Sequence, residues 1–313
     1  MFSIGVDLGG TTTSVGLVDT GGKIIDSVTF PTSTPSPEAW TEKVIKEIEI
    51  LIAKNNAKGN IAGIGIGAPC ANTVTGVIEA ATDLPWKSPV HLVKLFTERV
   101  PYRVVITNDA NAAAIGEMMY GAAKGLTDFI LITLGTGVGA GIVCDGKLLS
   151  GKHGFAGELG HMRFSFAMER KCGCGRFGCL QTVASAKGIV ETARLLLHKD
   201  SGSALSEIPE NQLTSKTIAE AAEKGDKLAI EVFQFTGEAL GKAMAEFAAI
   251  SDPKAIILFG GVAKAGSLIL EPAKKAFSEN SLHLYKDNVE ILISKIQESQ
   301  SAVLGAASLP LMQ

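Results

Sequence analysis

The 313-residue sequence has no run of like charge, and this absence excludes two large classes of partner. Its 29 Lys and Arg residues are balanced by 32 Asp and Glu residues, which gives a formal net charge of −3. A chain without a basic patch is a poor match to a surface that coats nucleic acid or to a polybasic membrane anchor. We therefore expect no nucleic acid and no membrane among its partners, and we favour small-molecule chemistry.

Long apolar stretches and aromatic residues are also scarce. No stretch approaches the roughly 18 consecutive apolar residues that a membrane span requires. The opening sequence MFSIGVDLGG has neither the basic region nor the cleavage site of a signal peptide, so we expect a cytoplasmic protein. Aromatic residues make up only 6% of the chain, whereas glycine occurs 35 times, which is more than turns alone usually require. This excess indicates that backbone approaches another group closely.

Cysteine is present in an odd number, which argues against a complete disulfide framework. Three of the five cysteines, Cys172, Cys174 and Cys179, fall within eight residues, and Cys172 and Cys174 are poorly placed to bridge each other. In a reducing compartment this spacing favours a metal site over disulfides. Together with His161, the three thiols form a Cys₃His set that suits tetrahedral Zn²⁺. Four protein ligands close the site, so we predict a structural ion.

Hydrophobic patterning predicts an α/β fold. The first thirty residues contain three apolar or alternating runs separated by glycine turns, which indicates a three-stranded meander. An amphipathic helix follows, with Trp40, Val44, Ile48 and Leu51 on one face. Beyond it, buried-looking strands alternate with helices, which is typical of α/β proteins.

The chain contains an internal duplication. The segments VDLGGTTTSVGLVDTGGKII and ITLGTGVGAGIVCDGKLL share a strand, a glycine turn after Leu8 or Leu134, a second strand, then Asp-Gly and Lys. Two sheet lobes that each present a glycine turn to a cleft could surround a polyphosphate with backbone N–H groups. We expect a sugar and phosphate lobe at 1–115, completed by a segment near 300–313. A second lobe at 116–300 would carry the zinc-binding insert and the nucleotide site.

Three glycine turns after apolar strands are the candidate phosphate sites. Glycine removes the side chains that keep a phosphate away from backbone amides, and threonine adds hydroxyl donors. Each turn alone is equally compatible with an ordinary hairpin, but their duplicated positions favour nucleotide binding, and Asp7 could orient a hydrated Mg²⁺. The turns match neither the P-loop nor the GxGxxG dinucleotide pattern. Their residues are Gly9, Gly10, Thr11 and Thr12, then Gly135, Thr136 and Gly137, and finally Gly260 and Gly261.

The pair Asn108-Asp109 stands where a buried-looking strand ends and a helix begins. One interpretation is a helix N-cap, a role that Asn and Asp fill well. The other rests on position, because α/β proteins place reactive groups at the carboxyl ends of their strands. A carboxylate there could accept the proton of a hydroxyl that attacks a γ-phosphate.

These motifs together resemble the ROK sugar kinases, a family of repressors, open-reading-frame proteins and kinases. The hallmark of that family is a Gly-His followed about ten residues later by CxCGxxGCxE, which stands here as Gly160-His161 and CGCGRFGCLQ. The resemblance extends through DLGGTT, GIGAP, TNDANAAA, LGTGVGAG, GELGH and LFGG, and so covers essentially the whole chain.

The resemblance implies two ribonuclease-H-like lobes of the actin/hexokinase type with an interlobe cleft. It also implies dependence on ATP and Mg²⁺, phosphorylation of a hexose hydroxyl, usually O6, and a homodimer. Asp109 would be the general base, while Asn108, Glu158 and His161 would bind sugar hydroxyls. A metal on one ring nitrogen of His161 would fix the direction of the other.

Two positions depart from the family pattern and leave the substrate open. The final Glu of the hallmark, a sugar-binding residue, is Gln181 here, and the Asn-Leu of the sugar loop is Asp83-Leu84. We expect glucose, with N-acetylmannosamine or fructose as alternatives and polyphosphate as an alternative donor. A non-catalytic sugar-binding regulator is the other alternative. Repressors of the family carry a helix-turn-helix domain first, and we expect none here because the first predicted strand begins near Phe2.

Overall fold

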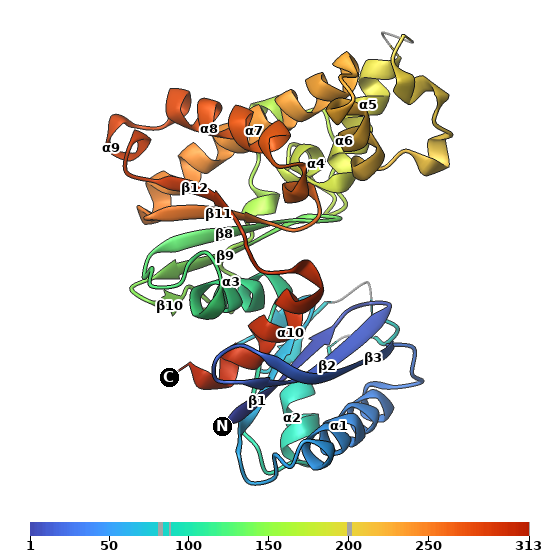
Figure 1. The fold of residues 1–313 in the computed structure, drawn as a ribbon, viewed down its shortest axis with the longest axis vertical. Helices are drawn as coiled ribbons and strands as arrows, with labels where there is room; N and C mark the ends of the chain where they lie inside the picture. Colours follow the sequence, from blue (N-terminus) through green and yellow to red (C-terminus); the bar gives the residue numbers. More distant parts are fainter. Residues whose placement is uncertain (81–83, 88, 199–201, 313) are drawn as a thin grey trace. The chain divides into compact units, whose positions relative to one another are not determined.

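The computed structural model describes residues 1–80, 84–87, 89–198 and 202–312, and the chain divides into two compact units (Figure 1). The first unit comprises Met1–Thr127, Gly141–Ala156 and Lys295–Gln313, and the second comprises Asp128–Ala140 and Gly157–Ser294. The first unit thus runs past residue 115 to Thr127, and it includes a segment from the second half of the internal duplication.

The first unit is built on a five-stranded sheet. Its strand order is β3-β2-β1-β4-β7. The bounds are β1 (Phe2–Leu8), β2 (Thr12–Asp19), β3 (Ile24–Pro31), β4 (Ile61–Gly67) and β7 (Val104–Thr107). The first three strands pair antiparallel, which confirms the predicted meander, and β4 pairs parallel with both β1 and β7. The predicted loop after β4 contains a short antiparallel pair, β5 (Ala71–Asn72) and β6 (Val77–Ile78).

Helices cover this sheet with the faces that the sequence predicts. The helix α1 (Pro37–Lys54) begins at the N-cap Ser36, whose side chain accepts the N–H of Ala39, and it buries the predicted apolar face. The short helix α2 (Leu92–Thr97) contacts α1 and β7, whereas α3 (Asp109–Tyr120) contacts β4 and a helix near the C-terminus. The largest buried rings gather here, with the centroid of Trp40 5.6 Å from that of Trp86 and 6.0 Å from that of Phe96.

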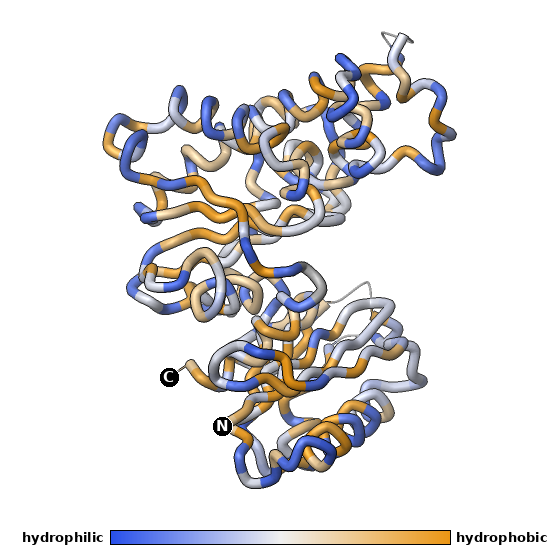
Figure 2. The backbone as a smooth tube through the Cα atoms, in the orientation of Figure 1, coloured by the Kyte–Doolittle hydropathy of each residue, from blue (hydrophilic) through white to orange (hydrophobic). Residues whose placement is uncertain are grey.

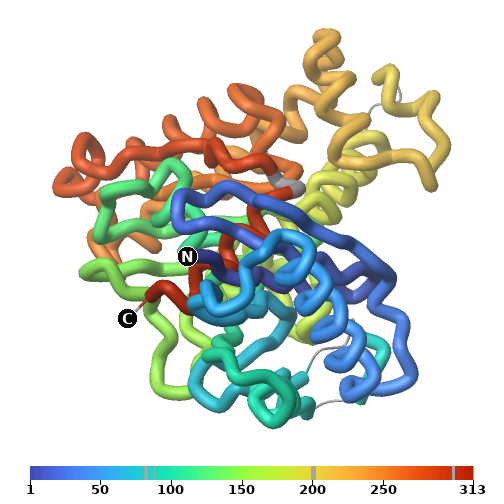
Figure 3. The backbone as a smooth tube through the Cα atoms, turned by 60° about the horizontal axis from the view of Figure 1, so that its bottom comes forward, coloured from blue at the N-terminus to red at the C-terminus, as the bar shows by residue number. Residues whose placement is uncertain are grey.

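The helix α10 (Glu298–Ser308) belongs to the first unit although it is far away in sequence. It contacts β1, β4 and α3, and Figure 3 shows this red segment beside the blue N-terminal strands. Glycine makes the approach possible: a Cβ at Gly5 or Gly65 would overlap the backbone carbonyl of Val303 or Ala306. The small-residue segment at the end of the chain is therefore a helix that lies directly on strand backbone.

The second five-stranded sheet repeats the strand order of the first. Its order is β10-β9-β8-β11-β12, in which three consecutive strands are followed by two later ones, and its residues from Gly141 to Leu148 are counted with the first unit. The bounds are β8 (Phe129–Leu134), β9 (Val138–Cys144), β10 (Lys147–Leu148), β11 (Ala255–Phe259) and β12 (Glu290–Ile293). Figure 2 shows that hydrophobic residues dominate β8 and β11, both of which are almost fully buried. The predicted α/β class is confirmed.

The helices of the second unit form a layer on its sheet. Its longest helix, α7 (Lys227–Ser251), packs closely along α8 (Ser267–Asn280), because Gly237 and Gly241 admit the backbone of the partner helix. The other helices are α4 (Gln181–Ala184), α5 (Ala186–Leu197), α6 (Ser215–Glu223) and α9 (His283–Lys286). Within the described ranges, every helix is too short or too polar to cross a membrane.

Candidate active site and metal centre

The glycine turn of the first unit joins β1 to β2. Gly9 donates its N–H to the carbonyl of Thr12 at 3.0 Å, which closes the turn, and Gly10, Thr11 and Thr12 are exposed. The N–H groups of Gly10 and Thr11 have no acceptor among the residues that the structure describes. Exposed, unpaired amides without side-chain cover are what a bound phosphate oxygen needs.

Asp7, on β1 just before this turn, interacts with Asp109 at the start of α3. Burial and, secondarily, the charge of Asp109 together raise the pKa of the Asp7 carboxyl to about 6. The structure therefore brings together two carboxylates whose predicted tasks differ, magnesium binding for Asp7 and proton transfer for Asp109. Two neighbouring carboxylates provide the hard oxygen ligands that Mg²⁺ prefers. The donor set thus fits a magnesium ion that would relieve their repulsion.

The structure separates the roles of Asn108 and Asp109. Asn108 is the N-cap of α3, and its side-chain oxygen accepts the N–H of Asn111 at 2.7 Å. Asp109 is the first residue of the helix, and its Oδ1 accepts the N–H of Ala110 at 2.8 Å. Because Asn108 already caps the helix, the Asp109 carboxylate is not needed as a cap. The cap interpretation therefore applies to Asn108 and leaves Asp109 available for chemistry.

The two glycine turns of the second unit lie side by side. Gly135 donates to the carbonyl of Gly137 at 3.0 Å, and Gly135 and Thr136 are exposed. Gly260 has a φ of +103°, and a Cβ at that position would lie 2.7 Å from the carbonyl oxygen of Leu134. The turn at Gly260 and Gly261 therefore lies against the end of the strand that leads into Gly135.

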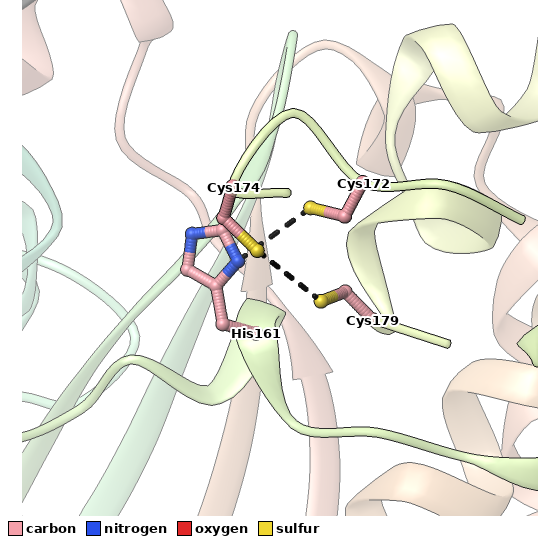
Figure 4. A group of neighbouring side chains, drawn as sticks. All are labelled: His161, Cys172, Cys174 and Cys179. Carbon is pink, nitrogen blue, oxygen red and sulfur yellow. Dashed lines mark hydrogen bonds between the residues drawn. The ribbon is translucent and has the colours of Figure 1, made fainter. Parts of the chain in front are cut away.

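His161, Cys172, Cys174 and Cys179 converge in the second unit, as Figure 4 shows. Their ligand atoms all lie within 4.8 Å of one another. The Nδ1 atom of His161 is 3.7 Å from the Sγ of Cys172, and the Sγ atoms of Cys174 and Cys179 are also 3.7 Å apart. Tetrahedral Zn²⁺ with Zn–S of about 2.3 Å and Zn–N of about 2.0 Å separates its ligands by about 3.5–3.8 Å. The spacing and chemistry of the four side chains therefore fit zinc.

Arg176 also contributes to this cluster, although none of the motifs in the sequence indicates a role for it. Hydrogen bonds from its backbone and its side chain hold the pKa of the Cys174 thiol below its usual range, whereas burial raises the pKa of Cys179. The guanidinium of Arg176 also donates to the carbonyl of His161 at 3.2 Å. The sequence does contain a signal for this role: Arg176 is the only basic residue between Cys172 and Cys179, and a nearby cation stabilises the thiolate form of cysteine.

The second ring nitrogen of His161 faces Glu158. The Nε2 atom lies 4.0 Å from Glu158 Oε2. Both residues stand in or beside the short 3-10 turn Leu159–His161. The imidazole can therefore give Nδ1 to a metal while Nε2 and the Glu158 carboxylate remain available for another ligand.

Gln181, at the start of α4, touches both the cysteine cluster and a glycine turn. Its amide nitrogen donates to the Sγ of Cys172 at 3.1 Å, and its carbonyl oxygen lies 3.1 Å from where a Cβ at Gly137 would stand. The backbone after α4 adds a further link, because the N–H of Ala186 donates to the carbonyl of Gly135 at 2.8 Å. A sugar contact of Gln181 stays a prediction. Asp83 lies outside the described residues.

Comparison with known proteins assigns the chain to a family. The model of the ROK family matches residues 3–312. The chain is 37% identical to a glucokinase of Halalkalibacterium halodurans, over 96% of this chain and 93% of that one. It is 34% identical to a glucokinase of Thermotoga maritima, over 98% and 96%. Among solved structures, it is similar to a ROK family glucokinase from Streptomyces griseus in complex with glucose and AMPPNP, with 32% identity, a TM-score of 0.79 and 99% of both chains covered. The chain is therefore a member of the ROK family.

Proposed function

We propose that this protein transfers the γ-phosphoryl group of ATP to a hexose hydroxyl, with glucose as acceptor and glucose 6-phosphate as product. The observation that carries the proposal is the pair of interacting carboxylates, Asp7 and Asp109, beside an exposed glycine turn. The similarity to two glucokinases along nearly the full length of each chain supports glucose as the acceptor. The AMPPNP and glucose of the Streptomyces griseus structure support ATP as the donor.

Asp109 is the general base in this proposal. As the hexose oxygen attacks the γ-phosphorus, its proton passes to the Asp109 carboxylate, while the bond from phosphorus to the leaving ADP oxygen breaks. The position of Asp109 at the start of α3, with Asn108 as the cap, supports this role. A positioned base of this kind contributes about 10²–10⁴ in rate.

The glycine turns bind the phosphates of ATP in this proposal. In the first unit, the outward N–H groups of Gly10 and Thr11 would donate to phosphate oxygens. In the second unit, considered by itself, the exposed N–H of Thr136 would do the same, because the N–H of Gly135 already donates to Gly137. Asp7 would hold a hydrated Mg²⁺, and a bound magnesium ion neutralises the charge that develops on the transferred phosphoryl group. With that charge neutralised, the two carboxylates and the anionic substrate can occupy the same region.

We also propose that His161, Cys172, Cys174 and Cys179 hold one structural Zn²⁺. Such an ion would fix the imidazole of His161 through Nδ1, which directs Nε2 and the neighbouring Glu158 toward sugar hydroxyls. Metal-binding thiols persist in a reducing compartment, which supports a cytoplasmic location.

We also propose that the protein forms a homodimer, and light scattering at several protein concentrations tests this.

A coupled assay of ADP formation across a panel of hexoses tests the function. We expect ATP-dependent turnover that is highest with glucose and lower with mannose, fructose and N-acetylmannosamine, and a parallel assay with polyphosphate tests the donor. No turnover with any hexose, together with micromolar sugar binding by calorimetry, would instead support a sugar-binding regulator. That result would remove the kinase assignment.

A further inference from the structure

Thr32, which directly follows β3, holds the glycine turn of the first unit by two hydrogen bonds. Its backbone N–H donates to the carbonyl of Thr11 at 2.9 Å, and its hydroxyl donates to the carbonyl of Gly9 at 2.8 Å. Thr32 is completely buried. A carbonyl oxygen can only accept, so the proton of the Thr32 hydroxyl is committed to Gly9.

That commitment orders two further buried side chains. The oxygen of the Thr32 hydroxyl lies 2.9 Å from the Oγ1 of Thr13, and because Thr32 donates elsewhere, Thr13 is the donor in this bond. Thr13 in turn accepts from the indole Nε1 of Trp40 at 2.9 Å, and an indole N–H can only donate. The donor chain therefore runs in one direction, from Trp40 through Thr13 and Thr32 to Gly9. All three side chains are fully buried.

The consequence lies in the direction of the turn's carbonyl groups. A phosphate is bound by N–H groups and repelled by carbonyl oxygens, so a phosphate-binding turn needs its carbonyls directed away from the ligand. Thr32 occupies the carbonyls of Gly9 and Thr11, while the N–H groups of Gly10 and Thr11 stay exposed without an acceptor in the described chain.

We propose that Thr32 is a positioning residue for nucleotide binding, and that the donor chain from Trp40 through Thr13 fixes its hydroxyl. The inference rests on the proposed role of the Gly9–Thr12 turn as a phosphate site. Trp40 is itself held by ring contacts with Trp86 and Phe96, so the chain begins at a rigid point in the core. Thr32 and Thr13 need not touch the substrate.

Two isosteric variants test the proposal. Thr32→Val removes the hydroxyl but keeps the N–H that donates to Thr11, and Thr13→Val interrupts the chain one bond further from the turn. We expect Thr32→Val to raise the KM for ATP by about tenfold or more, and Thr13→Val by a smaller factor. Glucose affinity, measured by calorimetry without nucleotide, should change by less than about twofold. Thr32→Ser, which keeps the hydroxyl, should restore most of the ATP affinity.

The neighbouring pair Ser14 and Thr29 provides a matched control. Their hydroxyls are also 2.9 Å apart and join the same two strands, but the pair is exposed and bonds to no carbonyl of the turn. Ser14→Ala and Thr29→Val should leave both substrate affinities unchanged. A merely structural role for Thr32 would lower thermal stability without separating ATP from glucose.

Direct titration with AMPPNP distinguishes failure of this inference from failure of the proposed function. If the protein binds AMPPNP but phosphorylates no hexose, the kinase proposal fails, and the AMPPNP affinities of the variants still test Thr32. Unchanged ATP KM and unchanged AMPPNP affinity in folded Thr32→Val and Thr13→Val would overturn the inference. If Thr32→Val does not fold, Thr13→Val decides the matter alone.

Discussion

The two glycine turns after β1 and β8 arise from the same sequence pattern, but the protein supports them differently. In the first unit, the carbonyl of Gly9 is held by a side chain, the hydroxyl of Thr32, at the end of a buried donor chain. In the second unit, the carbonyl of Gly135 is held by the backbone N–H of Ala186, close after a residue that contacts the cysteine cluster. The bond from Thr32 to Gly9 does not involve the metal site. The bond from Ala186 to Gly135 lies beside the cysteine loop, which a bound metal would order.

The largest effect that we expect lies in the first unit. Asp109→Asn should lower kcat by about 10²–10⁴ while the melting temperature and glucose affinity change little, because Asn108 caps α3 in either case. Steady-state kinetics and calorimetry on the same preparation measure both quantities. Near-normal turnover of the Asn variant would show that Asp109 is not the base and that the first unit does not supply the chemistry.

Metal removal should affect the second unit next most strongly. Purified protein should contain about one zinc per chain by elemental analysis, and its removal by a chelator should lower activity by about 10–100-fold. Hydrogen exchange should then increase around Gly135 and stay unchanged around Gly9. Protein that retains full activity with well under half an equivalent of metal would contradict the structural zinc.

Gly135→Val should raise the KM for ATP by about tenfold without loss of stability. A Cβ at Gly135 meets no atom within 4 Å, and its φ is not positive, so the folded protein accommodates the side chain. Only a ligand that approaches the backbone would be displaced. A lower melting temperature with unchanged ATP affinity would mean that this glycine serves the turn alone.

Gln181→Glu separates a metal contact from a sugar contact. A carboxylate cannot donate a hydrogen bond to the sulfur of Cys172 as the amide does. We therefore expect the variant to release zinc to a chelator about fivefold faster. If Gln181 instead binds the sugar, kcat/KM should rise for at least one of glucose, mannose, fructose and N-acetylmannosamine. Unchanged zinc release and unchanged kcat/KM for all four would remove Gln181 from both sites.

The smallest effect concerns stability and pH. The Asp7 carboxyl has its pKa raised from 3.8 to about 6, so the folded protein binds more protons than the unfolded chain in that window. Stability contributed by the protonated form is therefore complete below pH 3.8 and is lost as pH rises to about 6. Asp7→Asn should raise the melting temperature by a few degrees at about pH 8 and lose this gain near pH 4. Equal melting temperatures at about pH 8 would contradict the burial of this charge.

The parts of the site that could be predicted from sequence are those whose atoms are close in sequence. The spacing of Cys172, Cys174 and Cys179 predicts that the three thiols lie close together, because only a short glycine-rich loop separates them, and the structure brings them together with His161. The N-terminal meander could be predicted for the same reason, since β1 to β3 are consecutive in the chain and neighbours in the sheet.

The remaining features depend on contacts between distant residues, which no local pattern encodes. Thr32 bonds to Gly9, 23 positions away, and as an isolated sequence position it is a polar residue in a Pro/Ser-rich loop. The meeting of Asp7 with Asp109 depends on β4 lying between β1 and β7. Composition makes α10 hard to predict as a helix, because its small residues are selected for close packing against the glycines of β1 and β4 rather than for an amphipathic face.

The position of α10 also has a consequence for the synthesis of the protein. The helix α10 covers strands β1 and β4, which lie near the other end of the chain. Roughly 170 residues separate α10 from Thr127, where the first segment of this unit ends. At a ribosomal rate of about 5–20 residues per second, the backbone of Gly5 and Gly65 waits about 10–30 s for that cover after the strands have emerged. The first unit to be translated is therefore among the last to be completed, and during this interval its sheet is open to chaperones and to mispairing.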